Sequence, residues 1–337
     1  MANGTGLPNL SDYAKSIDPN GDVVPAVDRL AEENEIINDM PVIEGNLDTG
    51  DVYLASTERP AASKRRVNSG VEATKGKNEQ IVEGYAHYEQ RSIVDKRLVP
   101  AQAKIEDFRA QELGKSISAL GEGMSGEIFY GDAKEDPDAF NGFAVRYSDP
   151  KKAGRTLIDG KGTGTHLTSI YLVCWDKEVG AYGFVPKGAK VGINVTDLTP
   201  GNKPHKIEDA KKPGAAFLGY ETFVEWDQGI GVKDLRFCSR IANLDLDSIS
   251  DAELLKLLRR ATNMVQTLNK GKFCWYMNRW ATDRVEGALD AKNNVQFTNE
   301  SPSLLKLRTL HRIPLRMCDA IKGGAAEREG ETLVKFN

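Results

Sequence analysis

The residues best suited to bind an anion lie in one glycine-rich run, DGKGTGTH, from Asp159 to His166. Such backbone can wrap a phosphate with its amide groups. The Walker pattern, however, requires Gly-Lys followed directly by Ser or Thr, and here Gly162 follows Lys161. The next residues have the apolar character of a strand, whereas phosphate and dinucleotide loops lead into a helix. We therefore interpret the run as a surface loop.

Residue types that could support hydrolysis or metal binding are present but scattered. The histidines stand singly, without HExxH spacing, at His87, His166, His205 and His311. No GxSxG elbow accompanies them, so no nucleophile with its base is apparent. Asp245 and Asp247 resemble the start of a calcium loop but lack its glycine and distal glutamate, and we predict that they are turn residues. The sequence thus predicts no catalytic residue, no metal ligand, no cofactor and no enzyme activity.

The cysteines are far apart and form no CxxC pair; they are Cys174, Cys238, Cys274 and Cys318. Apolar or aromatic neighbours flank most of them, as in LVCW and KFCWYM. Free, buried thiols of a protein made in a reducing compartment are therefore expected.

The charge balance argues against a protein that grips nucleic acid tightly. The chain carries 45 Lys and Arg against 49 Asp and Glu, giving a net charge of −4, whereas phosphate binding usually needs a basic excess. The densest basic cluster is Lys64, Arg65 and Arg66. It could contact an acidic protein surface or DNA, or it could lie at a solvated tip. No aromatic residue is interleaved, so a stacking platform for single strands is not expected.

The length of 337 residues predicts more than one packed sub-domain. Hydrophobic residues make up 40% and charged residues 28%, as in a soluble folded protein. No apolar run is long enough for a membrane helix, and the first residues lack the pattern of a secretion signal. We expect a cytoplasmic protein.

The first part of the chain has too little apolar sequence for a core. Residues 1–45 are polar and proline-broken, with a short amphipathic piece around Leu30 and Ile37, and predict an arm that lies on something else. DVYLAST and QIVEGYAHYEQRSIV, separated by a charged, glycine-containing stretch, predict two long strands. Residues 46–98 are therefore expected to form an extended ribbon.

Helical and mixed sequence follows. Apolar residues at helical spacing predict a helix over 101–130, interrupted by Gly114, Gly121, Gly123 and Gly126, where close backbone packing is expected. TSIYLVCW and CWYMNRW read as buried strands. A capping box at Ser250 to Glu253 opens a helix with an apolar face through Leu268, ending at Gly271. Two strands around a turn are expected near the end, in LLKLRTLHRIPLRMCDAI.

Several blocks, in order and at matching spacing, carry a resemblance to a known family. The most specific are WDQGIGVKDLRFCSRIANLDLD (226–247), YMNR (276–279) and RIPLRMCDAI (312–321). FYGD with PDAFNGFAVRY, ending at Tyr147, and RRVNSGV in the ribbon add to them. From about Leu10 to Ile321 the chain resembles the major capsid proteins of short-tailed, podovirus-type bacteriophages, which adopt the Hong Kong 97-like capsid fold.

This resemblance implies an α+β fold with four parts. Residues 1–45 would be the N-terminal arm and 46–98 the extended β-ribbon loop. The peripheral domain would comprise 99–149, with its long spine helix, and 303–337; the axial domain would comprise 150–302. The implied function is a virion structural protein that self-assembles as hexamers and pentamers into an icosahedral head enclosing double-stranded DNA. An encapsulin-like nanocompartment shell and a nucleotide-binding enzyme using the loop at 159–166 are the alternatives.

The implied partners are other copies of the chain, packaged DNA held non-specifically, and scaffolding, portal and decoration proteins, without a membrane. A chain starting at Met1 favours a separate scaffolding protein over a removed N-terminal segment. Cross-linking through Lys75 or Lys77 has no identifiable catalytic glutamate, so monomers are expected on denaturing gels. Assembly in the bacterial cytoplasm is expected. The predicted interface residues are Ile36, Ile37, Met40, Val42, Lys64, Arg65, Arg66, Asn68, Gly70 and Val71.

Overall fold

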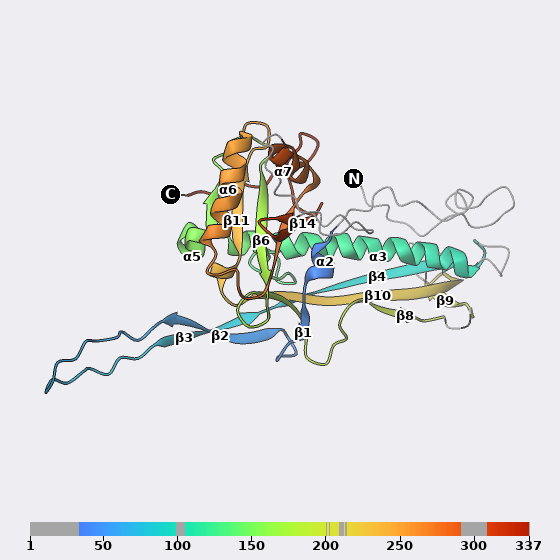
Figure 1. Ribbon diagram of the computed structural model, residues 1–337. Helices are drawn as coiled ribbons and strands as arrows, with labels where there is room; N and C mark the ends of the chain where they lie inside the picture. Colours follow the sequence, from blue (N-terminus) through green and yellow to red (C-terminus); the bar gives the residue numbers. More distant parts are fainter. Residues whose placement is uncertain are drawn as a thin grey trace. The chain divides into compact units, whose positions relative to one another are not determined.

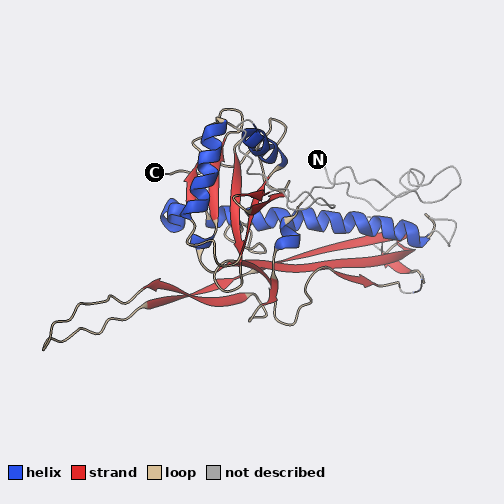
Figure 2. Cartoon of the chain, in the orientation of Figure 1, coloured by secondary structure: helices blue, strands red, loops and turns tan. Residues whose placement is uncertain are grey.

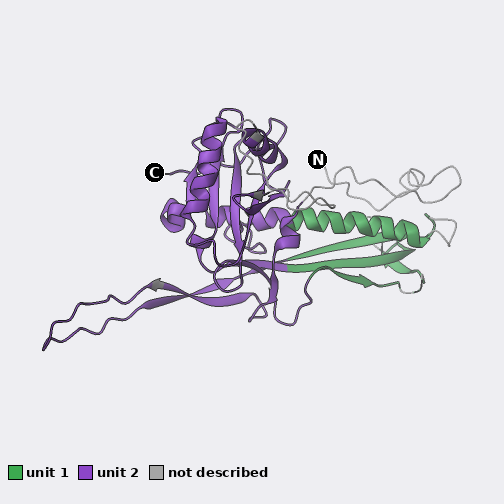
Figure 3. Ribbon diagram, viewed as in Figure 1, with its two compact units in different colours: residues 1–32, 87–124, 192–227 green, residues 33–86, 125–191, 228–337 purple. Residues whose placement is uncertain are grey.

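The computed structural model describes residues 34–98, 105–199, 201, 203–208, 212, 214–290 and 309–336. These residues separate into two compact units (Figure 3). The described residues of unit 1 fall within 87–124 and 192–227, and those of unit 2 within 33–86, 125–191 and 228–337. The segment 192–227, which we expected in the axial domain, thus clusters with the first part of the long helix.

Unit 1 is built from long elements. Helix α3 (Ile105–Tyr130) has its residues up to Met124 in this unit, together with most of β4 (Tyr85–Asp95) and β10 (Ala216–Val232). Strand β10 pairs with β4 and also, antiparallel, with the short strands β8 (Asn194–Asp197) and β9 (His205–Glu208). Figure 1 shows α3 running along β4 and β10.

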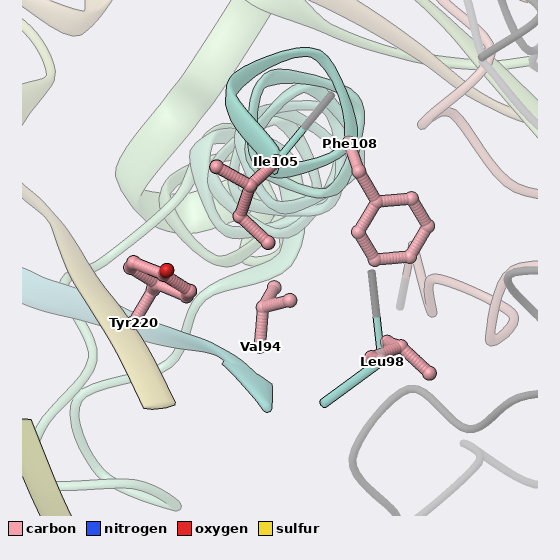
Figure 4. Close-up of a cluster of buried hydrophobic side chains, with 5 residues drawn as sticks. All are labelled: Val94, Leu98, Ile105, Phe108 and Tyr220. Carbon is pink, nitrogen blue, oxygen red and sulfur yellow. The ribbon is translucent and has the colours of Figure 1, made fainter. Parts of the chain in front are cut away.

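The core of unit 1 joins this helix to the two long strands. Val94, Leu98, Ile105, Phe108 and Tyr220 form one buried cluster, each at most 5% exposed (Figure 4). Ile105 and Phe108 are three residues apart, so they share one helix face. Burying each large apolar side chain contributes about 1.5–3 kcal/mol, before the entropy of ordering it. The predicted helix is confirmed from Ile105 onward; residues 101–104 lie outside the described residues.

Among the described residues, close packing against the Cβ position is present at only one of the four helix glycines. A Cβ added at Gly114, Gly121 or Gly126 would meet nothing within 4 Å. Only at Gly123 would it approach a neighbour, the Tyr88 ring, at 3.0 Å. Within the described part of the subunit, packing therefore explains only one glycine of this helix.

Unit 2 is centred on β6 (Thr168–Trp175), all of whose residues are buried. Strands β12 (Lys272–Met277) and β11 (Ser239–Leu244) flank it, both antiparallel. This environment on both edges and both faces explains the continuous apolar run TSIYLVCW. The other strands of this unit are β14 (Ile313–Met317), β13 (Thr309–Leu310), β5 (Leu157–Asp159), β7 (Ala181–Val185) and β1 (Val42–Glu44).

Aromatic side chains fill the core of unit 2. Phe129, Phe143 and Tyr171 pack with centroids 5.1–6.3 Å apart, and Trp175 contacts Phe143 and Tyr276 edge-on at 6.2 Å. Such tilted and edge-on pairs suit the ring quadrupoles. The four cysteines are buried thiols outside any disulfide, as predicted. Burial raises the pKa of Cys174 and Cys238 to about 12, so these thiols are unreactive at neutral pH.

Helices α6 (Asp251–Met264) and α7 (Arg279–Asp290) contact each other in unit 2, as Figure 2 shows in blue. The capping box that opens α6 is confirmed, because Ser250 Oγ accepts a hydrogen bond from the Glu253 amide at 3.3 Å. The predicted end at Gly271 is wrong. Val265 is extended and buried, and the Gln266 amide donates to the Arg236 carbonyl, so the chain leaves the helix before Leu268, which is exposed.

The predicted strand CWYMNRW is confirmed only as far as Met277. Asn278 ends it, since its Oδ1 accepts a hydrogen bond from the Ala281 amide at 2.9 Å and so caps the start of α7. The remaining helices are short: α2 (Ile36–Asp39), α4 (Phe143–Arg146) and α5 (Pro150–Ala153), with 3-10 turns η2 (Gly154–Thr156) and η4 (Leu235–Phe237). None of the described helices is long and apolar enough to cross a membrane.

The structure contains a two-stranded ribbon, but it is shorter than the predicted 46–98, because the predicted second strand is divided at Gly84 and its second half is β4 of the large sheet. Strands β2 (Asp51–Glu58) and β3 (Lys77–Glu83) pair antiparallel in a two-stranded sheet separate from the large one. Figure 1 shows the connecting loop continuing well beyond the paired strands. An isolated two-stranded sheet is marginally stable in water. The ribbon must therefore draw its stability from contacts outside itself.

Candidate assembly surfaces

The ribbon loop, defined here as residues 59–75, is exposed at every position. It carries five basic residues, namely Arg59, Lys64, Arg65, Arg66 and Lys75, against one acidic residue, Glu72. At its turn Val67 is 91% exposed and Asn68 adopts a left-handed conformation, with φ of 62°. Arg65 Nε donates to the Ser69 carbonyl at 2.8 Å across this turn. A basic surface with an apolar tip is thus held away from the subunit's own core.

The base of the ribbon is fixed by a buried ion pair. Arg146 Nη1 and Nη2 donate to Glu83 Oε1 and Oε2 at 2.7 and 2.8 Å, and Nη2 also reaches the Ile230 carbonyl at 2.9 Å. The Tyr53 hydroxyl lies 3.1 Å from Glu83 Oε1 and 2.9 Å from the Val232 carbonyl. Burial, followed by the negative charge of Glu83, raises the pKa of Tyr53, so the phenol remains a donor. Both strands are therefore attached to the body at one point.

A second contact holds the start of β2. The Tyr182 hydroxyl donates to Asp51 Oδ2 at 2.6 Å, and Asp51 is buried. Burial and this hydrogen bond raise the pKa of Tyr182. Gly50 packs so tightly that an added Cβ would lie 2.0 Å from the Glu83 carbonyl oxygen. Sequence inspection missed these anchors because their members are separated by up to 179 residues along the chain.

The predicted interface residues divide into two groups. Lys64, Arg65, Arg66, Asn68, Gly70 and Val71 all lie on the exposed ribbon loop. Ile36 and Met40 are buried inside their own subunit, at 0% and 6% exposure, while Ile37 and Val42 are half-buried. Ile36 and Met40 thus have no surface to offer a neighbour in this conformation. Whether any of the ten lies at an interface stays a prediction.

An ion-pair cluster explains why the α2 segment is held in place. Arg316 Nε donates to Asp39 Oδ2 at 2.8 Å, and Lys272 Nζ lies 2.9 Å from Asp39 Oδ1. The Tyr276 hydroxyl lies 3.1 Å from Asp39 Oδ2. Burial alone would raise the pKa of Asp39, but the hydrogen bond from Lys272 and the charge of Arg316 lower it overall. Residues of the predicted arm from Asn34 onward are therefore part of unit 2.

A cleft opens in unit 2 beside an acidic loop, defined here as residues 131–138. Its volume is about 380 Å³, and Tyr130, Asp132, Glu135, Ala144, Val145, Ser148, Arg240, Glu331, Thr332, Leu333, Val334 and Lys335 line it. At its floor Arg240 Nη2 donates to Glu331 Oε2 at 2.8 Å, with both side chains buried. The Tyr130 hydroxyl also contacts Glu331. These floor charges satisfy one another. At the rim the carboxylates of Asp132 and Glu135 outnumber the exposed cation of Lys335, so the rim is negative on balance.

The glycine run at 159–166 packs against the chain around Asn243. The Gly160 and Gly162 amides donate to the Ala242 and Asn243 carbonyls, each at 2.8 Å. A Cβ at Gly162 would lie 2.7 Å from the Asn243 oxygen. These two amides are therefore unavailable to a phosphate. Asp245 and Asp247 form a turn, as predicted, with the Asp247 amide donating to Asp245 Oδ1. Within the described ranges no cluster of His, Cys, Asp or Glu could hold a metal ion.

Together, a long helix on long strands, a mixed sheet with helices and a projecting ribbon define the Hong Kong 97-like capsid fold. The solved structure of bacteriophage Epsilon15 shares this fold, with a TM-score of 0.71 and 23% identity over 96% of this chain and 98% of that one. The bacteriophage JBD30 capsid (TM-score 0.49, 9% identity, 87% and 93% covered) and the SrpI encapsulin of Synechococcus elongatus PCC 7942 (0.44, 9%, 71% and 96%) are more distant.

The chain belongs to the family described as major capsid protein GP7, whose model matches residues 18–328. No curated protein sequence matches it. The resemblance inferred from the sequence blocks is thereby confirmed. The protein is a structural subunit of an icosahedral bacteriophage head.

Proposed function

We propose that this chain forms hexamers and pentamers that close into a head around double-stranded DNA, with the ribbon loop as a principal contact between subunits. The single observation that carries the proposal is the ribbon itself. Among the described residues, both outer edges of this two-stranded sheet are unpaired, and such edges present backbone groups that readily accept another strand or side chain. Its fully exposed loop has no role in the subunit's own core.

The buried anchors at the ribbon base support this role. Glu83 and Asp51 are buried and bonded, so the direction in which the ribbon leaves the body is defined. A projecting element with a fixed base and an exposed loop suits a geometric contact repeated around a shell. We also propose that the rest of the chain forms two domains of the shell subunit. The peripheral domain would comprise 99–149 and 303–337, and the axial domain 150–302.

The net charge of −4 suits a wall that encloses DNA without binding it tightly. We propose that assembly takes place in the bacterial cytoplasm and uses scaffolding and portal proteins. The N-terminal arm, whose residues before Asn34 lie outside the described part of the chain, is proposed as a further contact between subunits.

Electron microscopy of the protein expressed alone and purified by size tests the proposal. Uniform closed shells would show that one chain suffices for closure. Sheets, tubes or open pieces would show self-association that needs a scaffold. Monodisperse monomers at high concentration would contradict the proposal.

A deletion then assigns the ribbon's role. Removing residues 60–75 and joining the strands with a short Asn-Gly turn should leave a folded subunit, because every deleted residue is exposed. Such subunits should fail to close shells. Normal shells from this variant would remove the ribbon from the assembly mechanism.

A further inference from the structure

We propose that the ribbon loop of one subunit docks into the cleft beside the acidic loop of a second copy, with Val67 entering the cleft. This inference rests on the proposed function and identifies the partner surface of the ribbon. Both surfaces belong to unit 2, and each is exposed in the isolated subunit.

Charge complementarity favours this partner. The ribbon loop has a net charge of +4 from its five basic residues and Glu72. The acidic loop at 131–138 has four carboxylates, on Asp132, Glu135, Asp136 and Asp138, against Lys134, and its residues 133–138 are exposed. Opposite patches of this kind steer association and fix register. A second copy of the chain supplies both surfaces, so the contact can repeat from subunit to subunit.

The shape of the cleft suits the apolar tip of the ribbon. Ala144, Val145, Leu333 and Val334 contribute apolar surface to the lining, and Leu333 is 47% exposed. The volume of about 380 Å³ lies in the range of ligand pockets. Val67, at 91% exposure, is the most exposed large apolar side chain among the described residues. Docking would cover both apolar surfaces together.

The arrangement of charges around Val67 fits the same geometry. Lys64, Arg65 and Arg66 precede it directly, so their head groups can reach the rim while the valine enters the interior. The rim carboxylates Asp132 and Glu135 belong to the lining itself. The floor pair of Arg240 and Glu331 is already satisfied, so the cleft demands no buried charge from the incoming loop. A valine flanked by cations is therefore a suitable occupant.

Charge reversal on the ribbon loop, on the acidic loop and then on both together tests whether charge complementarity drives the docking. Lys64→Glu/Arg65→Glu/Arg66→Glu and Glu135→Lys/Asp138→Lys change only exposed side chains, so both variants should fold with wild-type melting curves. Each should lose shells by about tenfold or more, because like charges then face each other. The chain carrying both sets should recover them. A combined variant no better than either parent would overturn the docking.

Disulfide trapping tests the geometry independently. Val67→Cys/Leu333→Cys places one thiol on the ribbon and one in the cleft, whereas the native cysteines are buried. After mild oxidation of particles, a denaturing non-reducing gel should show a ladder of covalent multimers. Val67→Cys/Leu268→Cys, with a cysteine of similar exposure on another surface, should give monomers. A single fast-migrating monomer band from the first variant would mean docking within one chain and would overturn the proposal.

The outcomes separate this inference from the capsid function. If wild-type chains form shells but the Val67→Cys/Leu333→Cys variant gives no ladder of covalent multimers, the docking is wrong and the capsid function stands. If wild-type chains stay monomeric, both proposals are wrong. If ribbon reversal reduced only the DNA content of normal shells, the ribbon would face DNA and the docking would be wrong.

Discussion

Arg146 holds both carboxylate oxygens of Glu83, at 2.7 and 2.8 Å, with side-chain exposures of 11% and 4%. Glu83 is the last residue of β3, so this pair joins the end of the ribbon to α4. The hydrogen bond and charge of Glu83 raise the pKa of Arg146 against the opposing effect of burial. A buried ion pair thus contributes to the attachment of the ribbon.

Glu83→Gln should destabilise the subunit by about 3–5 kcal/mol, because it leaves the Arg146 charge buried without a counter-charge. Urea denaturation measures the loss. Glu58→Gln is the matched control, since Glu58 pairs with Lys77 on the same ribbon with both side chains exposed, and it should change stability by less than about 1 kcal/mol. Equal effects from the two variants would show that the buried pair does not anchor the ribbon.

The pKa of His87 should lie above its ordinary value of 6.5, chiefly because protonated Nδ1 donates a 2.6 Å hydrogen bond to Asp227 Oδ1. A raised folded-state pKa means that the contribution to stability is complete below pH 6.5 and is lost as pH rises through the folded pKa. Histidine ring resonances followed by NMR against pH give the value directly. Asp227→Asn should lower it; an unchanged titration would contradict the contact.

Asp39 should make the stability of the subunit depend on pH in the acid range. Its lowered pKa means that its contribution is present above the ordinary value of 3.8 and is lost as pH falls through the folded pKa. Asp39→Asn should therefore destabilise the subunit at neutral pH and flatten the acid limb of its stability curve. Urea midpoints measured from neutral to acid pH test this. Asp48→Asn, at an exposed position, should leave the whole curve unchanged.

Asn243 should be hard to replace. It adopts φ of 55°, its side-chain oxygen accepts from the Val334 amide, and its side-chain nitrogen donates to the Val334 carbonyl, each at 2.8 Å. Asn243→Ala loses both bonds and strains the backbone, at a cost of about 2–3 kcal/mol. Hydrogen exchange at residues 329–336 should accelerate. Asn243→Gly can keep the backbone conformation and should destabilise the subunit less. Exchange rates of Asn243→Ala that stay at the wild-type level would show that Asn243 does not hold residues 329–336 in place.

Gly114→Ala should make the isolated subunit more stable. Among the described residues no atom outside the helix's own backbone lies within 4 Å of the added Cβ, so helix propensity should stabilise the isolated subunit by about 0.8–1 kcal/mol. Thermal melting measures this gain. Gly229→Ala is the opposite control, since its Cβ would lie 2.4 Å from the Phe184 ring, and it should destabilise. A Gly114→Ala subunit that melts lower than wild type would contradict the open environment.

The sequence predicted those elements that depend on interactions between residues close together in the chain. The spine helix, the capping box at Ser250 and the buried strand at Thr168 depend on propensity and periodicity over a few residues. The helix end at Met264 was missed because Val265 and Gln266 leave the helix for contacts with distant chain, including the Arg236 carbonyl. The ribbon was predicted from its lack of apolar surface, since no core could hold it.

The anchors and the cleft could not be predicted in the same way. Glu83 and Arg146 are separated by 63 residues, and Asp39 and Arg316 by 277. One sequence contains no signal that pairs such charges, because each is an ordinary surface residue type. The ribbon's basic cluster was visible in the sequence, whereas its complement at 131–138 acquired meaning only when folding placed it beside a cleft.

The buried pair of Arg240 and Glu331 also orders events during synthesis. The ribosome adds a further 91 residues after Arg240 before the carboxylate that neutralises it exists. Until then the core strand β11 carries an uncompensated charge, which opposes burial by several kcal/mol. A chain that ends before Glu331 would leave the Arg240 charge without its partner, so we expect such a chain to be less stable and to be excluded from the shell.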